Sequence, residues 1–253
     1  MTPAQQKLLT QALKKLDKPR LMECIVDLAS SVPETWRALE GSLQLEPQTT
    51  ADLISRTRLA ISNATDFDER MVNHNFSYDY QAYEQIEQYF RQFVKAGDLS
   101  TVMQLSMELI TNGSYQMEMS DEGLMYDEIE GCLNVVCNAV ERSDLPPEKV
   151  LVWGVAIEEC DRIGVFTRPK LAWEKTYPVE VWSAVADELI GDLGPDQDGF
   201  PVSERRRAII LRNAEIALTK ARRADEIDAL RKFSSQMNAM KSKRSKRRKG
   251  PSR

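Results

Sequence analysis

Residues 80–113 read YQAYEQIEQYFRQFVKAGDLSTVMQLSMELITNG, and this stretch decides the fold class. Its two halves carry apolar side chains at helical spacing, and Ala96-Gly97-Asp98 lies between them. Glycine suits the left-handed residue that ends a helix, and aspartate suits the position that begins the next. We therefore predict a helix over 80–95, a tight turn, and an antiparallel helix over 99–111 that Asn112-Gly113 closes.

The same helical pattern recurs along the chain, whereas the alternation typical of a strand does not occur. The predicted helices cover 5–16, 21–29, 35–43 and 50–64, then the pairs 124–140 with 148–160 and 203–220 with 225–237. Each such pair buries its apolar face only by stacking on its neighbours. We predict an all-α fold, an α-solenoid of antiparallel helical hairpins.

The predicted organisation follows from this pattern and from one long break, GDLGPDQDGFPV at 191–202. We assign N-terminal helices to 1–65, a helical-hairpin repeat body to 66–190, a loop to 191–202, a C-terminal hairpin to 203–240 and a tail to 241–253. Gly199 would fit the sixth position of a calcium loop, but Arg205 then occupies the twelfth, where a glutamate is required. We predict a loop there and no calcium site.

The charge is distributed unevenly along the 253 residues. The whole chain has 34 basic and 39 acidic side chains, yet the tail KSKRSKRRKGPSR holds eight bases and no acid. The tail has no large apolar residue, so we predict that it is disordered in isolation. The beginning of the chain lacks the pattern of a signal peptide, and no apolar run is long enough to cross a bilayer. We expect a cytoplasmic protein that does not enter membranes.

The basic tail is the strongest functional signal in the sequence. Its candidate nucleic-acid-binding residues are Lys241, Lys243, Arg244, Lys246, Arg247, Arg248, Lys249 and Arg253. Such a segment gains affinity for phosphate backbones by counterion release, and without an aromatic residue its binding would tolerate any base sequence. A solvated solubility tail, contact with a protein partner, and folding back onto the acidic body are the alternatives.

Acidic residues near position 120 are the weak candidates for a metal site, namely Glu118, Asp121 and Glu122. Asp127, Glu128 and Glu130 follow, and Asp66, Asp68 and Glu69 could join them in space. Acids in the first turn of a helix are also ordinary partners of the helix dipole, and we favour that interpretation. We predict no metal and no cofactor.

The remaining reactive residue types give no catalytic motif. His74 is the only histidine, and no GxSxG, GxxxxGK[ST] or strand-linked GxGxxG pattern is present. The cysteines Cys24, Cys132, Cys137 and Cys160 each lie in an apolar helical pattern without the spacing of a zinc site, so we predict buried thiols. We likewise expect the aromatic residues between 76 and 93 to pack in the core.

The stretches NHNFSYDYQAYEQI and ELITNGSYQMEMSDEGLMYDEIEGCLNVV resemble the helical-repeat region of certain uncharacterised bacterial proteins, some of which also carry a SWIM-type zinc finger. The segment EIALTKARRADEIDAL is similar to tetratricopeptide-like hairpins, where Ala214, Ala217 and Ala221 would let helices approach closely. The resemblance covers roughly 66–235 and implies a scaffold. The chain has no CxC or CxH, so no metal function is implied.

The most plausible function on these grounds is a non-catalytic scaffold that binds an unidentified protein partner. The alternative is a nucleic-acid-associated accessory protein tethered by its basic tail. A third possibility is a metal-dependent hydrolase or nuclease that uses the carboxylates near Asp121.

Overall fold

The structure is a computed structural model, and it describes residues 2–32, 35, 39, 49–67, 79–119, 125–194 and 203–235. These residues form helices, turns and loops, with no strand among them, which confirms the all-α prediction for this part of the chain. Two compact units are present, Met1–Leu53 and Ile54–Arg253, which we call the N-terminal and C-terminal units. Of the helix predicted over 35–43, residues 35 and 39 are described, and the remainder and the basic tail lie outside the described residues.

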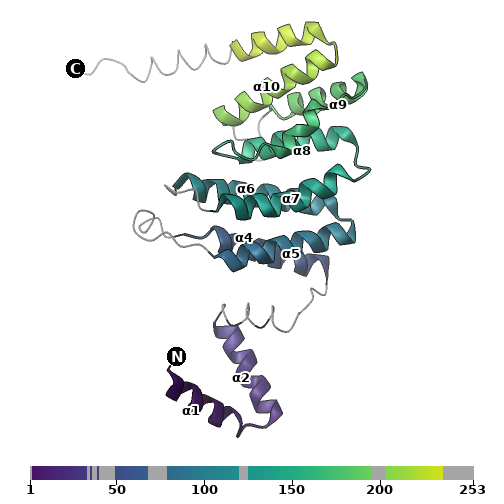
Figure 1. The fold of residues 1–253 in the computed structure, drawn as a ribbon. Helices are drawn as coiled ribbons and strands as arrows, with labels where there is room; N and C mark the ends of the chain where they lie inside the picture. Colours follow the sequence, from purple (N-terminus) through teal and green to yellow (C-terminus); the bar gives the residue numbers. More distant parts are fainter. Residues whose placement is uncertain are drawn as a thin grey trace, which may run out of the picture. The chain divides into compact units, whose positions relative to one another are not determined.

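The N-terminal unit contains two helices, α1 (Pro3–Leu13) and α2 (Lys18–Ser31), drawn in purple in Figure 1. Thr2 caps α1: its hydroxyl accepts a hydrogen bond from the Gln5 backbone N–H, and its own N–H donates to the Gln5 side chain. Asp17 caps α2 by accepting from the backbone N–H of Arg20 at 3.0 Å. Proline fits the first turn of a helix, so α2 begins before the predicted start at residue 21.

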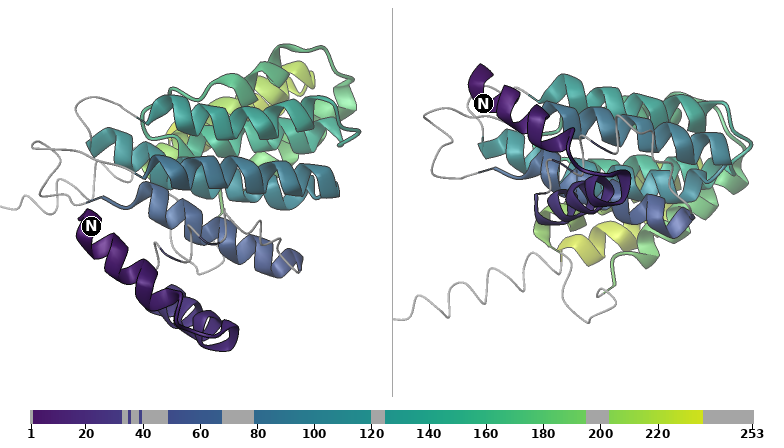
Figure 2. Two further views of the ribbon diagram at one scale, coloured as in Figure 1. Left: turned by 60° about the horizontal axis from the view of Figure 1, so that its bottom comes forward. Right: turned by 90° about the horizontal axis from the view of Figure 1, so that it is seen from below.

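The C-terminal unit contains the remaining described helices, which Figures 1 and 2 show lying largely alongside one another. The first turn of its first helix crosses the boundary between the units. In chain order its elements are α4 (Thr50–Thr65), α5 (Tyr80–Ala96), α6 (Leu99–Met119), α7 (Tyr126–Glu141), α8 (Pro147–Cys160), the 3₁₀ helix η1 (Arg168–Glu174), α9 (Val179–Gly191), α10 (Glu204–Lys220) and a helix at 224–235.

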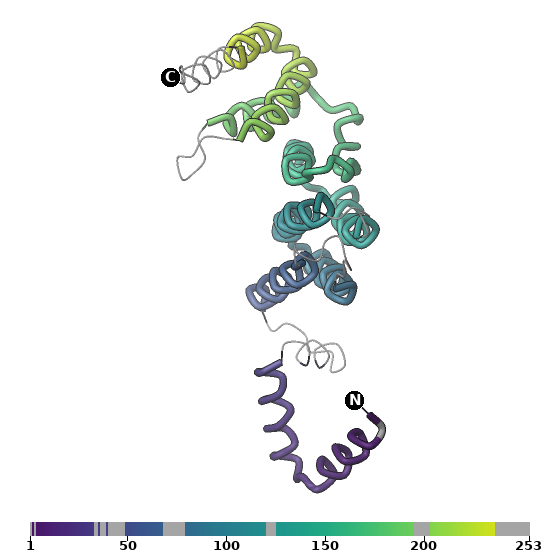
Figure 3. The backbone as a smooth tube through the Cα atoms, turned by 90° about the vertical axis from the view of Figure 1, so that its left-hand side faces the viewer, coloured from purple at the N-terminus to yellow at the C-terminus, as the bar shows by residue number. Residues whose placement is uncertain are grey.

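These helices pack in a regular succession, seen end-on in two columns for α4 to α8 in Figure 3. α5 packs against α7, and α6 packs against α7 and α8. α4 joins α6 through a polar chain, since Tyr83 donates to the Gln116 side chain and Gln116 donates to the Ala64 carbonyl oxygen at 3.0 Å. Further along, α8 packs against α9 and α9 against α10. Each helix pair is therefore buried by the next.

The turn between α5 and α6 has the predicted structure. Gly97 ends α5 with a φ of 76°, the left-handed conformation that glycine adopts without steric penalty. The Asp98 carboxylate accepts a hydrogen bond from the Thr101 backbone N–H at 3.1 Å and so caps α6.

The predicted end of α6 at Asn112-Gly113 is wrong, because α6 continues to Met119. Gly113 is buried inside the helix, and a Cβ atom there would lie 2.6 Å from Cδ1 of Ile129 on α7. The glycine thus provides space for the neighbouring helix rather than a stop signal.

Residues 161–190, to which the sequence periodicity assigned no element, contain η1 and all of α9 except its last residue, Gly191. The connection is fixed by the buried carboxylate of Asp161, which accepts hydrogen bonds from the backbone N–H groups of Ile163, Gly164 and Phe166. A seven-residue 3₁₀ helix has no 3.6-residue period, so the periodicity does not reveal it.

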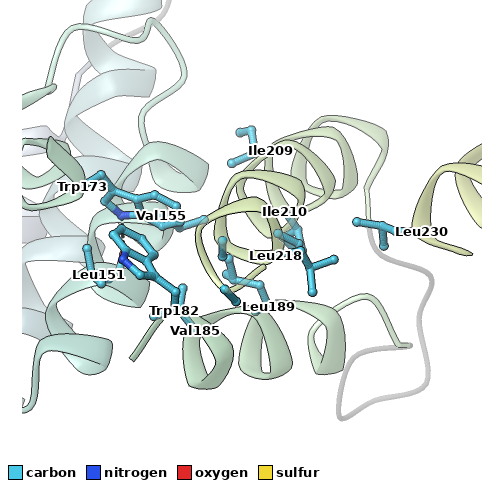
Figure 4. Packing of buried hydrophobic residues seen from close by; sticks show 14 residues of the cluster. Leu151, Val155, Trp173, Trp182, Val185, Leu189, Ile209, Ile210, Leu218 and Leu230 are labelled. Atoms are coloured by element: carbon cyan, nitrogen blue, oxygen red, sulfur yellow. Dashed lines mark hydrogen bonds between the residues drawn. The ribbon is translucent and has the colours of Figure 1, made fainter. Parts of the chain in front are cut away.

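Two tryptophans join η1 and α9 to the core, as Figure 4 shows. The ring centroids of Trp173 and Trp182 lie 5.4 Å apart, and the Trp173 indole N–H donates to the Leu151 carbonyl oxygen at 3.0 Å. The alanines of α10 that the resemblance singled out, Ala214, Ala217 and Ala221, are buried in the same cluster.

The prediction of buried thiols holds for Cys132 and Cys137, whereas Cys160 is partly buried and Cys24 is exposed. Cys24 lies on α2, and no described residue of α1 or α2 is buried, so the apolar pattern around this thiol is not covered. Of the aromatic residues, Tyr83, Tyr89, Phe90 and Phe93 are core residues, and Tyr80 is exposed. Within the described ranges, every helix is too short or too polar to cross a bilayer.

The close approach of α8 and η1 depends on Gly154. A Cβ atom at this position would lie 2.8 Å from the backbone oxygen of Pro169, which cannot rotate away. We expect Gly154→Ala to destabilise the fold by about 1–3 kcal/mol, although alanine is the better helix former. Gly131→Ala on α7 is the matched control, because nothing lies within 4 Å of its Cβ position; it should gain about 0.5–1 kcal/mol. Urea unfolding of both variants measures the difference, and equal effects would contradict the contact.

The buried cysteines generate a prediction about pH. Burial raises the pKa of the Cys132 thiol, and it raises that of Cys137 to about 12. In a chain carrying Cys24→Ser and Cys160→Ser, these two thiols should react with a disulfide reagent only on unfolding. The unfolded chain releases their protons near pH 9 and the folded chain does not, so stability should fall as pH rises above about 9. Rapid labelling of the native protein by the disulfide reagent would contradict the first expectation, because the reagent would then reach the two thiols without unfolding.

Candidate functional site

Two adjoining hollows of about 580 and 600 Å³, which share Arg142, form a concave surface of the C-terminal unit. The first lies between α5 and α7, and the second continues from the end of α7 to α8 and η1. We call them together the basic groove, after the cationic side chains that line it: Arg91, Lys95, Arg142, Arg168 and Lys175. Glu141 is the one acidic residue lining either hollow.

Arg168 of η1 joins the two hollows. Its guanidinium donates hydrogen bonds to the side-chain oxygens of Asn134 and Asn138 and pairs with the Glu141 carboxylate at 3.2 Å. The three acceptors stand four and three residues apart on α7, so they lie on one face of that helix. Arg168 thereby attaches η1 to α7 and neutralises Glu141.

This arrangement determines which groups the two asparagines can offer. Arginine only donates hydrogen bonds, so both amide oxygens must face Arg168, and the NH₂ groups of Asn134 and Asn138 are available for another acceptor. The basic groove therefore presents hydrogen-bond donors around its centre.

Three cations of the groove have no acidic partner among the described residues. Lys95, Arg142 and Lys175 are exposed and form no ion pair with a described residue. Arg91 is exposed and pairs at 2.5 Å with the partly exposed Glu87, one turn earlier on α5. The groove thus has a net positive charge, in contrast to the acidic chain as a whole.

Apolar side chains lie between these charges. Val135 and Trp153 are buried and line the two hollows, and the Trp153 indole N–H is already bonded to the Met103 carbonyl oxygen. Leu171 is half exposed at the rim, beside Tyr177. Such a surface suits a ligand that carries both negative charge and apolar side chains.

An acidic hollow of about 190 Å³ adjoins the basic groove at Gly131. It lies at the beginning of α5 and α7 and contains Tyr80, Tyr83, Glu84, Glu87, Asp127 and Glu128. Acids near the start of a helix and bases near its end complement the helix dipole. The charge of the surface therefore changes sign along α5 and α7.

A second cluster of arginines lies near the start of α10, and two of its three arginines are paired with glutamates. Arg162 pairs with Glu118 at 3.1 Å, and Arg206 pairs with Glu159 at 3.0 Å. Arg205 donates to the backbone oxygens of Glu159 and Asp161. Because burial raises the pKa of Glu159, its ion pair with Arg206 compensates a desolvated carboxylate. We interpret this cluster as a structural link between α6, α8 and α10.

The polar contacts of Lys170 have a similar structural role. Its ammonium lies 2.7 Å from the Glu158 carboxylate and 2.5 Å from the Asn213 side-chain oxygen. Burial lowers the pKa of Lys170 to about 8, while the adjacent carboxylate favours the charged form. Lys170 lines neither the basic groove nor the acidic hollow, so it connects η1 to α8 and α10.

Most sequence-predicted site residues lie outside the described ranges: the eight basic residues of the 241–253 tail, Asp121, Glu122 and His74. Glu118, the described member of the metal candidates, forms the ion pair with Arg162. Of the neighbouring acids, Glu130 accepts a hydrogen bond from the Tyr126 hydroxyl at 2.8 Å. The described residues contain no group of three or more metal-ligating side chains.

Comparison of the chain with protein-family models, with curated proteins and with solved structures gives no match. The resemblance to bacterial helical-repeat proteins therefore stays a prediction. The residues of the basic groove were not identified from the sequence. The available signal in the sequence was that Asn134, Asn138 and Glu141 share one face of a helix predicted to be amphipathic. Arg168, the partner of all three, follows only after another helix, so the sequence did not link it to them.

The contribution of the Arg168 contacts to stability can be measured by comparison with another arginine of the same groove. Lysine cannot reach three acceptors with one ammonium, so we expect Arg168→Lys to destabilise the fold by about 1–2 kcal/mol. Arg142→Lys conserves charge in the same way at a position without an ion pair and should change stability by less than about 0.5 kcal/mol. Urea unfolding compares the two variants. Equal stabilities would mean that the Arg168 contacts contribute nothing.

Proposed function

We propose that this chain is a non-catalytic α-solenoid scaffold whose basic groove binds an acidic, extended segment of a partner protein. The observation that carries the proposal is the combination of uncompensated cations and free amide donors with apolar side chains in one groove. The groups offered to a ligand there are donors, and carboxylates and backbone carbonyl oxygens are the matching acceptors.

Support for the repeat architecture comes from the packing of successive helix pairs. α5 lies against α7 and α6 against α8, so equivalent helices of consecutive pairs are neighbours. Stacks of this kind present long surfaces built from corresponding helices, and such surfaces bind extended peptides. Gly131 and Arg142, at the two ends of the first hollow, are eleven residues apart on α7, which corresponds to roughly 16 Å. That length accommodates about five residues of an extended peptide.

The apolar side chains of the groove favour a peptide that carries large apolar residues as well as acidic ones. Leu171, which is half exposed, is accessible to a leucine or aromatic side chain of the ligand, and the partly buried Tyr177 lines the same hollow. Burial of such a side chain contributes affinity, whereas the surrounding charges mainly determine which partners are accepted. We therefore propose acidic segments that also contain large apolar residues.

A nucleic acid is a less suitable ligand for this groove. Its phosphate backbone would pass the acidic hollow that adjoins at Gly131, and residues 1–240 carry 26 basic against 39 acidic side chains. Like charges at these positions reduce affinity. Nucleic-acid binding through the tail stays the alternative proposal, supported by its eight bases. The hydrolase hypothesis depends on the carboxylates near Asp121. Asp121 and Glu122 lie outside the described residues, and the described Glu118 is paired with Arg162.

Peptide binding can be measured with two fluorescein-labelled 12-residue probes that share the same leucine and phenylalanine positions. One carries aspartate and glutamate at the other positions and the second carries lysine. We expect saturable binding of the acidic probe alone, weakening as salt rises. Lys95→Glu with Arg142→Glu should weaken it at least tenfold, because both attraction and hydrogen bonds are lost.

The matched control is Lys232→Glu with Arg222→Glu, which makes the same change of charge at two exposed positions outside the groove. It should leave affinity within about twofold, as should deletion of residues 241–253. Equal losses in the groove variant and the control would mean that the overall charge, not the groove, attracts the peptide. Binding that disappears with the tail would favour the alternative proposal.

A further inference from the structure

The side chains of α7 that line the first hollow of the basic groove form a regular row. Asn134, Asn138 and Arg142 follow one another at intervals of four residues, and all three line this hollow. Four residues of an α-helix rise by about 6 Å and complete little more than one turn, so the three side chains lie on one face. The row therefore presents hydrogen-bond donors to the groove at steps of about 6 Å.

Arg168 orients the two amide groups of this row. The asparagines line the first hollow and not the second, whereas Arg168 lines the second and not the first. Because both amide oxygens accept from Arg168, at 2.7 Å for Asn138, the NH₂ groups point to the other side, toward the first hollow. Asn134 is partly buried, which restricts its side chain further. The donors are thus fixed in direction before a ligand binds, and this lowers the entropic cost of binding.

The spacing of these donors matches the main chain of an extended peptide. Each residue of a β-strand advances by about 3.3 Å, and the carbonyl groups along one edge recur at every second residue, about 6.6 Å apart. This interval differs by only about 0.6 Å from the step of the row on α7. A helical ligand could not use the same donors, because its carbonyl oxygens already accept hydrogen bonds within the helix. The row therefore favours a ligand in extended conformation.

We infer that this row binds the main chain of the acidic segment, an inference that rests on the proposed function of the basic groove. Two carbonyl oxygens, from residues separated by one position, accept from the NH₂ groups of Asn134 and Asn138, and the peptide runs along α7 toward Arg142. Strand side chains alternate between two faces, so every second acidic residue faces the groove, where Arg91 and Lys95 also stand four residues apart on α5. The main-chain contacts supply affinity for any sequence, and the alternate side chains determine selectivity.

Replacing single peptide bonds of the acidic 12-residue probe by esters tests the inference on the full chain. An ester weakens the carbonyl acceptor and removes the N–H group that points to the opposite edge of the strand. We expect esters at alternate positions to weaken binding about three- to tenfold, the effect of losing one hydrogen bond. Esters at the intervening positions should change affinity by less than about twofold, because their carbonyl oxygens face solvent. Fluorescence anisotropy measures each affinity.

A double-mutant cycle assigns one of these hydrogen bonds to Asn138. Asn138→Asp keeps oxygen acceptors for Arg168 but lacks the NH₂ donor, and its added charge weakens the amide and ester forms of the probe equally. One of the esters that weaken binding to the wild-type chain should therefore lose its effect in this variant. Ser100→Asp adds the same charge at an exposed position of α6 that lines neither hollow, and it should keep every ester effect. Circular dichroism checks that both variants keep their helices.

The outcomes separate this inference from the proposed function. Saturable binding of the acidic probe with no ester effect, with equal effects at all positions, or with effects that recur every three to four positions overturns the inference and leaves the proposed function in place. Ester effects that all survive Asn138→Asp also overturn it, because the donor would then belong to another residue. An acidic probe that does not bind at all overturns both. If Asn138→Asp does not fold, the ester series on the wild-type chain still decides, since it requires no change in the protein.

Discussion

The constraint on which this chain depends is that a pair of amphipathic helices cannot bury its own apolar side chains. In the C-terminal unit the next pair covers them: α7 covers α5 and α6, and α10 covers α9. Small residues make the contacts close, since Gly113 admits Ile129 and Gly154 admits the backbone of Pro169. In the described part of the N-terminal unit, residues 2–32 contain no buried side chain, so α1 and α2 alone do not satisfy this constraint.

The position of the basic groove follows from which helix faces are not buried by packing against neighbouring helices. Once α7 has buried one face against α5 and α6, Asn134, Asn138 and Glu141 occupy a different face of the helix, where a backbone segment can be attached. Arg168 uses all three acceptors and turns the amide NH₂ groups outward. A contact that stabilises η1 therefore also determines the polarity of the groove. Stability and ligand preference cannot be separated at Arg168, whereas Lys95 and Arg142 contribute to the groove alone.

Sequence reasoning succeeded where a local rule is enough. Gly97 and Asp98 carry the chemistry of a helix end and a helix start, and the structure contains both. It failed at Gly113, because the same residue type can end a helix or admit a neighbour, and only the position of Ile129 decides between them. Cys24 shows the same limit. The apolar residues around it in the sequence predicted a buried thiol, but Cys24 is exposed. The groove was missed because Arg168 meets its acceptors across about 30 residues of sequence, a relation that periodicity does not contain.

A scaffold that binds a peptide through a shallow, charged groove gains modest affinity from its charges, because exposed charges are screened by salt. Most of the affinity would then come from the apolar side chains that lie between these charges, since burial of apolar surface does not depend on charge. The charges would mainly determine which segments are accepted. A partner with several acidic segments that engage more than one copy of the scaffold would be held more tightly than one segment alone, because the second contact forms at a high effective concentration.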